Sequence, residues 1–219
     1  MNIKQALMKA KNWIKYLYNN IYKINYCKEK IFFKMKSEKY DYSKLKRCGN
    51  NIFISAGVVF RRPELICIGN NVAIDHGVYI TTGVEINDYI HIAPYVTIIG
   101  GKKVNIIMDN FTTIAAGSRL ICSSDNHMGE GLVGPTIPQQ FQDTRKTGNI
   151  IFKQFASIGT NVIVMPGITL AEGSVVGSNS LLLEDTKPWS VYIGTPAKKI
   201  KDRPRNKMKN MAKELGYEF

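Results

Sequence analysis

Residues 68–98 read IGNNVAIDHGVYITTGVEINDYIHIAPYVTI, and a large aliphatic side chain stands at every sixth position of this stretch. The isoleucines in this phase are Ile68, Ile74, Ile80, Ile86, Ile92 and Ile98. A second apolar series keeps the same interval two places earlier, at Val72, Val78, Val84, Ile90 and Val96. An α-helix repeats every 3.6 residues and a strand every two, so neither explains an interval of six. The interval predicts a parallel β-helix of hexapeptide repeats, in which each repeat supplies one short strand and one corner.

The same interval returns closer to the C-terminus and extends this prediction over most of the chain. Its positions there are Ile158, Val164, Leu170, Val176 and Leu182, preceded by Val162, Ile168, Ser174 and Ser180. Between the two runs, Ile107, Ile114 and Leu120 keep the rhythm with irregular spacing. A solenoid built from 219 residues can bury one continuous core along its axis. We therefore expect an all-β solenoid whose periodic aliphatic side chains point inward.

The composition divides the chain into segments of different kinds. Residues 1–47 are rich in lysine and aromatic residues and predict one or two amphipathic helices, whereas residues 48–199 carry the repeats. Residues 123–149 break the six-residue phase and are rich in turn formers, so they predict a loop that leaves the solenoid wall. Long loops inside compact repeat domains are usually functional, so this loop is the expected active-site loop. Residues 200–219 predict a charged tail with a short helix.

The net charge of +13 lies mostly at the two ends of the chain. Residues 1–47 hold 13 Lys and Arg against three acids, and residues 198–219 hold eight against three. The repeat body is thus close to neutral, whereas a nucleic-acid-binding protein more often carries a basic stripe on its folded body. Nucleic acid is therefore not an expected partner. The basic N-terminal segment is expected either to cap the open end of the solenoid or to touch an anionic membrane face.

The location of the protein is predicted from its apolar runs and its cysteines. No stretch approaches the ~20 apolar residues that a membrane span requires, and lysines interrupt the apolar runs of the N-terminal segment. The four cysteines, Cys27, Cys48, Cys67 and Cys122, are scattered and form no CxxC pair. Scattered cysteines of this kind are typical of free thiols in a reducing compartment. A cytoplasmic protein is the resulting expectation.

The active-site loop contains the best candidate for a catalytic base. His127 follows Asp125 and Asn126 in an irregular polar stretch, and histidine titrates in the range that general-base catalysis at neutral pH requires. Asp125 is expected either to orient the imidazole or to contact the substrate, and Asn126 is a further substrate-binding candidate. His76 and His91 fall on outward or corner positions of the repeats, where an ordinary solvent-facing histidine is the alternative to a function. His91 is kept as a substrate-binding candidate.

The C-terminal half of the repeats resembles a known enzyme family. Its landmarks are Pro166–Gly167, Gly177–Ser178 and the segment IGTPAKKIK at 193–201. These residues are similar to those of the left-handed β-helix acetyltransferases, which include galactoside, maltose and nodulation-sugar O-acetyltransferases. The segment SDNH at 124–127 stands where that family shows Thr/Ser-x-x-His at the start of its active-site loop. The segment GPTIPQQF at 134–141 is reminiscent of acetyltransferases from surface-polysaccharide gene clusters.

The resemblance implies a left-handed coil, a homotrimer and acetyl-CoA as the donor, with the pantetheine arm lying along the coil wall between neighbouring subunits. It further implies that Gly159, Thr160 and Ser178 offer hydrogen bonds to that arm. Lys198 and Lys201, directly after the GTPA segment, are expected near the phosphates of the adenosine end. Lysine is a competent phosphate ligand, although it binds as a point charge rather than bidentately. A solvated tail is the alternative for both lysines.

These observations together predict an acetyl-CoA-dependent sugar acetyltransferase of bacterial surface-polysaccharide (O-antigen-type) biosynthesis, most simply one that N-acetylates a nucleotide-linked amino-deoxysugar. O-acetylation of a sugar hydroxyl is the first alternative. A hydroxyl is the weaker nucleophile and would make the base more important. A non-catalytic trimeric scaffold is the alternative from another class. Zinc chemistry is not expected, because His76, His91 and His127 occupy different corners and no metal ligand set is apparent.

Overall fold

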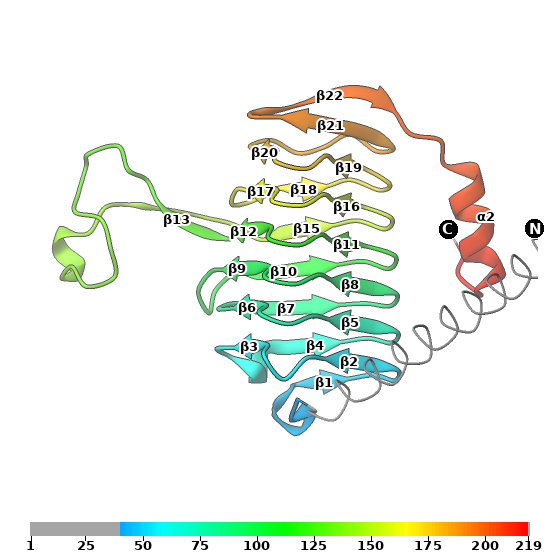
Figure 1. The fold of residues 1–219 in the computed structure, drawn as a ribbon. Coiled ribbons are helices and arrows are strands. Elements are labelled where there is room, and N and C mark those ends of the chain that lie inside the picture. Colours follow the sequence, from blue (N-terminus) through cyan, green and yellow to red (C-terminus); the bar gives the residue numbers. More distant parts are fainter. Residues whose placement is uncertain (1–39, 219) are drawn as a thin grey trace, which may run out of the picture. The chain divides into compact units, whose positions relative to one another are not determined.

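The computed structural model describes residues 40–218, and their strands wind into a three-sided solenoid (Figure 1). Successive strands of the chain belong to successive walls, so each wall gains one strand per coil. All pairings along the walls are parallel except the last pair of the second sheet. The first sheet contains β1 (Arg47–Cys48), β4 (Ile66–Ile68), β7 (Gly83–Ile86), β10 (Asn105–Met108), β15 (Ile150–Phe152) and β18 (Thr169–Leu170). These strands are short because a corner follows after each repeat.

The other two walls are built in the same way. The second sheet contains β2 (Ile52–Ile54), β5 (Val72–Ile74), β8 (Ile90–Ile92), β11 (Thr113–Ile114), β16 (Ser157–Ile158), β19 (Val175–Val176), β21 (Ser190–Gly194) and the antiparallel β22 (Ala197–Asp202). The third sheet contains β3 (Val59–Phe60), β6 (Tyr79–Ile80), β9 (Thr97–Ile99), β12 (Arg119–Ile121), β17 (Ile163–Val164) and β20 (Leu181–Leu182). Short 3₁₀ turns lie at Tyr42–Lys44, Pro63–Leu65 and Gln139–Phe141. This architecture confirms the predicted left-handed parallel β-helix.

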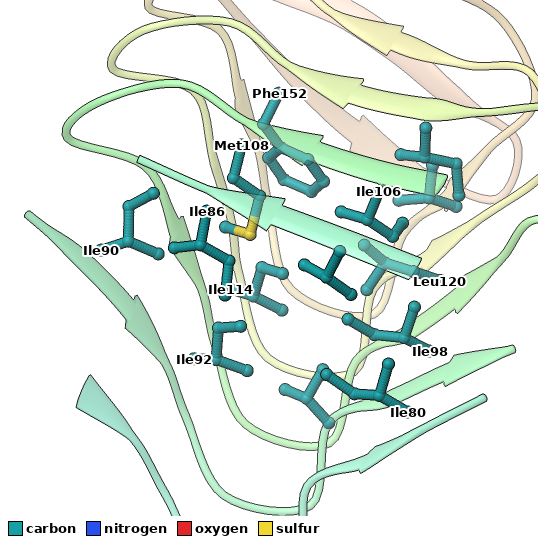
Figure 2. Packing of buried hydrophobic residues seen from close by; sticks show 14 of the residues in the cluster. Ile80, Ile86, Ile90, Ile92, Ile98, Ile106, Met108, Ile114, Leu120 and Phe152 are labelled. Carbon is teal, nitrogen blue, oxygen red and sulfur yellow. The ribbon is translucent and has the colours of Figure 1, made fainter. Parts of the chain in front are cut away.

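The predicted inward series form the core of the solenoid. All six isoleucines of the 68–98 series are at most 1% exposed. The second series, Val72 to Val96, is at most 2% exposed, and the C-terminal positions from Ile158 to Leu182 are likewise buried. Figure 2 shows how neighbouring coils stack these side chains on one another inside the three walls. Burial of this continuous apolar column is the main stabilising contribution that the repeats make.

The prediction that Ile107 points inward is wrong. Ile106 and Met108 are fully buried, whereas Ile107 lies on the outer side of β10. Ten residues separate the inward Ile98 from the inward Met108, where the repeat has six, because a turn at 100–104 is inserted between β9 and β10. Since strand side chains alternate between faces, a shift of one residue exchanges the two faces. The rhythm after the insertion is therefore set by Ile106 and Met108.

One corner of the solenoid carries a column of aromatic rings. Between the first and second sheets each coil has one residue with positive φ, and these residues are Asn51, Asn71, Tyr89, Phe111, Phe155, Gly173 and Trp189. We call Tyr89, Phe111, Phe155 and Trp189 the aromatic corner. Phe111 stacks between Tyr89 and Phe155 with ring-centroid distances of 5.2 and 5.3 Å. Gly173 interrupts the column, because a Cβ there would lie 2.4 Å from the Trp189 ring.

The C-terminal tail runs back along the aromatic corner. Helix α2 (Asn206–Glu214) buries Ala212 against Phe155 and Trp189, and Figure 1 shows it beside this edge of the solenoid. Beyond the helix, the Tyr217 hydroxyl donates to Asp88 at 2.7 Å. The short C-terminal helix predicted from the sequence is thus confirmed. The tail joins the last coil to one near the start of the solenoid.

Residues 123–149 leave the solenoid as an arm. Its base is an antiparallel ribbon of β13 (Ser123–Asp125) and β14 (Arg145–Thr147), and Figure 1 shows it extending away from the walls. The predicted loop is therefore partly a β-ribbon. The amphipathic helices predicted within 1–47 fall almost wholly outside the described residues, of which 40–47 hold a 3₁₀ turn and the start of β1. No helix within 40–218 has the length and apolar character needed to cross a bilayer.

Candidate active site

A cavity of about 440 Å³ lies where the arm leaves the solenoid. Two of its apolar lining residues come from the third sheet, where Ile99 ends β9 and Ile121 ends β12. The other lining residues come from the 100–104 turn and from the arm: Gly100, Gly101, Ser123, Ser124, Asp125, His127, Pro135 and Arg145. A concave site with apolar walls and a few converging polar groups is typical of small-molecule binding. We call this edge of the solenoid the arm corner.

Asp125 is the carboxylate of this cavity, and the register of the ribbon sets its surroundings. Because Asp125 is the cross-strand partner of Arg145, the guanidinium Nε donates to the carboxylate at 3.0 Å. The backbone N–H of Gly134 donates to the other carboxylate oxygen at 3.1 Å. The Asp125 side chain is 17% exposed, so it keeps some access to the cavity. Its partners are Arg145 and Gly134 rather than the imidazole of His127.

His127 lines the same cavity but is held by its backbone. It adopts φ of 60°, a conformation that few non-glycine residues take, and its backbone N–H donates to the buried carboxylate of Asp143 at 2.8 Å. The side chain is exposed, and within 40–218 no hydrogen bond or ion pair engages the imidazole. Asp143 thus fixes where the histidine stands, while the ring is free to meet a substrate. Asn126, the third predicted residue of the arm, is exposed beside them.

Cys122 is the thiol nearest to the arm, directly before β13. It is fully buried and free, and burial raises the pKa of its thiol to about 12. Only the thiolate is an effective nucleophile, so Cys122 is protonated and inert near neutral pH. The thiol of Cys122 therefore serves the core and is not a candidate nucleophile.

His91 lies on a different wall. Its side chain projects from β8 of the second sheet, and its Nε2 is 2.8 Å from the carboxylate of Asp75. This imidazole is about half-exposed and does not line the cavity at the arm corner. The structure therefore does not bring His91 together with His127 and Asp125 within one chain.

The residues predicted for the donor gather at the remaining corner, between the second and third sheets. Gly159 packs against Ser178, since a Cβ at Gly159 would lie 2.7 Å from the Ser178 backbone nitrogen. The carbonyl of Thr160 accepts from Asn179 at 2.9 Å in the next coil. One coil further, the hydroxyl of Thr195 donates to the carbonyl of Asn179 at 3.2 Å. The GTPA segment thus continues the same edge, which we call the donor corner.

Lys198 and Lys201 lie on β22 beyond the donor corner, and both are exposed. Neither has an ion-pair partner within the described residues, whereas the adjacent Lys199 pairs with Asp202 at 2.6 Å. Free ammonium groups in this position are available to an anionic ligand. Within 40–218, no group of three or more His, Cys, Asp or Glu side chains is arranged to hold a metal ion.

Three features of the site were missed by the sequence prediction. Arg145 lies 20 residues from Asp125, which it contacts, and Asp143 lies 16 residues from His127, so only the ribbon register brings each pair together. The turn at 100–104 is visible in the sequence only as irregular spacing of the inward positions, although it lines the cavity. The signal for the turn was available in the sequence: GGKK at 100–103 interrupts the phase. No local signal pairs Arg145 with Asp125.

Sequence comparison finds relatives among sugar acyltransferases, although no protein-family model matches the chain. The chain is 33% identical over 163 residues to the dTDP-4-amino-4,6-dideoxy-D-glucose acyltransferase of Escherichia coli, which covers 73% of this chain and 83% of the relative. It is 30% identical over 128 residues to the putative lipopolysaccharide biosynthesis O-acetyl transferase WbbJ of Escherichia coli K12, covering 57% of this chain and 60% of WbbJ.

Structure comparison leads to similar proteins. A mutant of AntD, an N-acyltransferase from Bacillus cereus, in complex with dTDP-4-amino-4,6-dideoxyglucose and coenzyme A, superimposes with a TM-score of 0.75. The two chains are 35% identical, and the match covers 80% of this chain and 92% of AntD. AntD in complex with dTDP and 3-hydroxybutyryl-CoA gives a TM-score of 0.77 at 34% identity, covering 82% and 97% of the two chains.

Proposed function

The chain belongs to the hexapeptide-repeat sugar acyltransferases, and we propose that it transfers an acetyl group from acetyl-CoA to the amine of a nucleotide-linked amino-deoxysugar. Relatives named as acyltransferases and neighbours that bind coenzyme A make it an acyl-CoA-dependent enzyme, as the sequence predicted. The observation that carries the proposal is the cavity at the arm corner, where the Asp125 carboxylate and the His127 imidazole face one small-molecule-sized space.

The proposed chemistry follows from these two side chains. The amine lone pair attacks the thioester carbonyl carbon, a C–N bond forms, and the C–S bond breaks as coenzyme A leaves as its thiolate. The attacking nitrogen must lose a proton, which His127 can accept and pass to the thiolate. The exposed part of the Asp125 carboxylate can accept a hydrogen bond from the neutral amine and so orient it for attack.

The amine is favoured over a hydroxyl by the way His127 is held. A base that must activate a hydroxyl is usually oriented by a third group on its other ring nitrogen. Within 40–218 the imidazole has no such partner, because Asp143 binds the backbone and Asp125 binds Arg145. A deprotonated amine already has its lone pair and places a smaller demand on the base. O-acetylation is the second candidate, since WbbJ is named as an O-acetyl transferase.

A homotrimer is part of the same proposal, because the predicted site residues are divided between corners. Gly159, Thr160 and Ser178 lie at the donor corner, whereas Asp125 and His127 belong to the arm corner. Apolar residues exposed on the arm support a contact with another chain, and they are Met128, Leu132, Val133 and Phe141. In a trimer, the arm of one chain would meet the donor corner of its neighbour.

The cellular setting is proposed from the same evidence. Cys48, Cys67 and Cys122 are free in the structure, as expected for a reducing compartment, so we place the enzyme in the cytoplasm. The name of WbbJ supports a role in surface-polysaccharide synthesis. Contact of the basic N-terminal segment with a membrane concerns residues outside those described, and it stays a prediction.

The test is a coenzyme A release assay with acetyl-CoA and matched acceptors. We expect the highest kcat/KM with dTDP-4-amino-4,6-dideoxyglucose or another nucleotide-linked amino-sugar, and far less with its 4-hydroxy counterpart. Mass spectrometry of the product distinguishes an amide from an ester. Transfer to the hydroxyl compound alone would replace the N-acetyl proposal by the O-acetyl one. Light scattering, together with recovery of activity on mixing inactive His127→Ala and Ser178→Trp chains, tests the shared trimer site.

A further inference from the structure

We propose that Lys102 and Lys103 bind the diphosphate of the nucleotide-linked acceptor, which makes the turn at 100–104 a specificity element of the arm corner. The inference rests on the proposed function, because it assigns a phosphate subsite to the same cavity. The 100–104 turn is inserted into the repeat one coil from the base of the arm, and Figure 1 shows the β9–β10 connection on the side of the solenoid from which the arm extends.

The turn is fixed rather than loosely attached. The backbone N–H of Gly100 donates to the Thr81 hydroxyl at 3.0 Å. The fully buried Thr82 donates through its hydroxyl to the carbonyl of Gly101 at 2.9 Å and also contacts the carbonyl of Val104. Hydrogen bonds thus connect both ends of the turn to the preceding coil. The backbone of a turn held in this way loses little further conformational entropy when the turn binds a ligand.

The turn forms part of the cavity and supplies cations next to it. Gly100 and Gly101 line the cavity, and no atom outside residues 100–102 lies within 4 Å of the position that a Cβ of Gly101 would take, so a ligand can approach the backbone there. Lys102 and Lys103 follow directly and are both exposed. Neither is paired with an acid among residues 40–218. Two lysines that follow the cavity lining directly in the chain can attract an anionic ligand to it.

The charge inside the cavity indicates which part of the acceptor these lysines bind. The guanidinium of Arg145 in the lining pairs with the Asp125 carboxylate at 3.0 Å, and the Asp125 side chain keeps 17% of its surface exposed. An amino-sugar therefore finds the carboxylate, but its diphosphate finds no unpaired cation in the lining itself. Lys102 and Lys103 supply that missing charge one or two residues beyond Gly101. They would hold the nucleotide while the sugar amine points to Asp125 and His127.

Coenzyme A also carries a diphosphate, so binding of the acceptor's diphosphate must be distinguished from binding of coenzyme A. The residues predicted for coenzyme A lie at the donor corner and on β22, whereas Lys102 and Lys103 belong to the arm corner. We therefore assign the lysines to the acceptor. The assignment predicts that their loss weakens nucleotide binding and leaves acetyl-CoA binding unchanged.

The experiment is calorimetric titration of the full chain and of a Lys102→Ala/Lys103→Ala variant with dTDP, UDP and acetyl-CoA. The expected result is at least a tenfold loss of affinity for the better-bound nucleoside diphosphate, with acetyl-CoA affinity unchanged. Lys102→Arg/Lys103→Arg should restore binding, because it keeps both cations. A Lys207→Ala/Lys213→Ala variant removes the same net charge from exposed positions of α2 and should bind all three ligands as the parent does. The loss should shrink as salt rises from low to physiological ionic strength.

Three outcomes would overturn the inference: no nucleoside diphosphate binding by the parent chain, equal nucleotide affinity in the two alanine variants, or a loss of acetyl-CoA affinity instead. The last would assign the lysines to coenzyme A. None of these titrations depends on turnover. Failure of the proposed function would appear separately, as absence of acetyl transfer to amino-sugars by a chain that still binds the nucleotide through Lys102 and Lys103.

Discussion

The aromatic corner and the arm corner are two edges of one solenoid that the chain completes in opposite ways. At the aromatic corner the chain turns tightly in each coil, and the rings of Phe111 and Phe155 stack with an interplanar angle of 7°. At the arm corner the segments 100–104 and 123–149 leave the repeat, and a cavity remains. Coils of the same kind thus form a closely packed aromatic corner and an arm corner that contains a cavity.

The difference shows how a repeat fold separates stability from function. Strands in a parallel wall are spaced about 4.8 Å apart, so side chains at one position of successive coils stack on each other. At the aromatic corner this stacking is reinforced by the tail, where Arg203 donates to the carbonyls of Phe155 and Gly173 at 3.1 and 3.0 Å. An insertion breaks the stacking and exposes polar groups, which a binding site requires. The arm corner therefore gives up packing to form the site.

The largest expected effect comes from Trp189→Ala at the aromatic corner. Trp189 is buried against Phe155 and α2, so its truncation should lower the free energy of unfolding by about 3 kcal/mol or more. Denaturant unfolding measures this, and KM for both substrates should not change at a temperature where the variant is folded. Tyr95→Ala is the matched control, because Tyr95 also has positive φ but is 61% exposed. An equal loss of stability in both variants would contradict the special role of the aromatic corner.

The next effect concerns His127, whose replacement should lower turnover and leave stability unchanged. His127→Ala or His127→Asn should leave the melting temperature unchanged, because no hydrogen bond or ion pair within the described residues engages the exposed ring, and should lower kcat. General-base catalysis supplies about 10²–10⁴-fold, so a hydroxyl acceptor should lose at least about a hundredfold and an amine acceptor less. Steady-state kinetics with both acceptors measures this. Unchanged turnover on each acceptor would remove His127 from the mechanism and direct attention to His91.

A smaller effect is expected at the donor end. Lys198→Ala and Lys201→Ala should raise KM for acetyl-CoA by about three- to tenfold with less effect on kcat, because contacts to remote phosphates are similar in the ground and transition states. Lys199→Ala is the control on the same strand, since Lys199 already pairs with Asp202. Dephospho-CoA donors should abolish the penalty for whichever lysine meets the ribose phosphate. Wild-type acetyl-CoA affinity in both variants would show that the two lysines are merely solvated.

The smallest effect is a pH dependence of the tail. Partial burial, with the hydrogen bond to Asp88 and its negative charge, raises the pKa of Tyr217 to about 12 from an ordinary value of 10.0. Because the folded state holds this proton more tightly, its stabilising contribution is complete below about pH 10 and is lost as pH rises toward 12. Limited proteolysis of the tail should therefore accelerate above pH 10, and Tyr217→Phe should remove that pH dependence. A parent tail equally protected at pH 8 and pH 11 would contradict this linkage.

Much of the site could be found from the sequence, and the limits have a physical cause. His127 and Asp125 were predicted from their place in a polar segment that leaves the repeat, and both line the cavity. Arg145 was not predicted, because its contact with Asp125 depends on the register between two strands that are far apart in the sequence. Ile107 was placed inward because the length of the insertion before it was not recognised.

The sequence by itself determined the solenoid, because every coil repeats one local steric pattern. A side chain at every sixth position, from Ile68 to Ile98, must point inward if each short strand is followed by a corner, and no long-range information is needed for this. Only the tertiary structure decided which insertions meet. The turn at 100–104 and the arm at 123–149 share a cavity because they leave the same corner in neighbouring coils. The winding of the coils makes these two segments neighbours in space, and their separation along the chain does not reveal it.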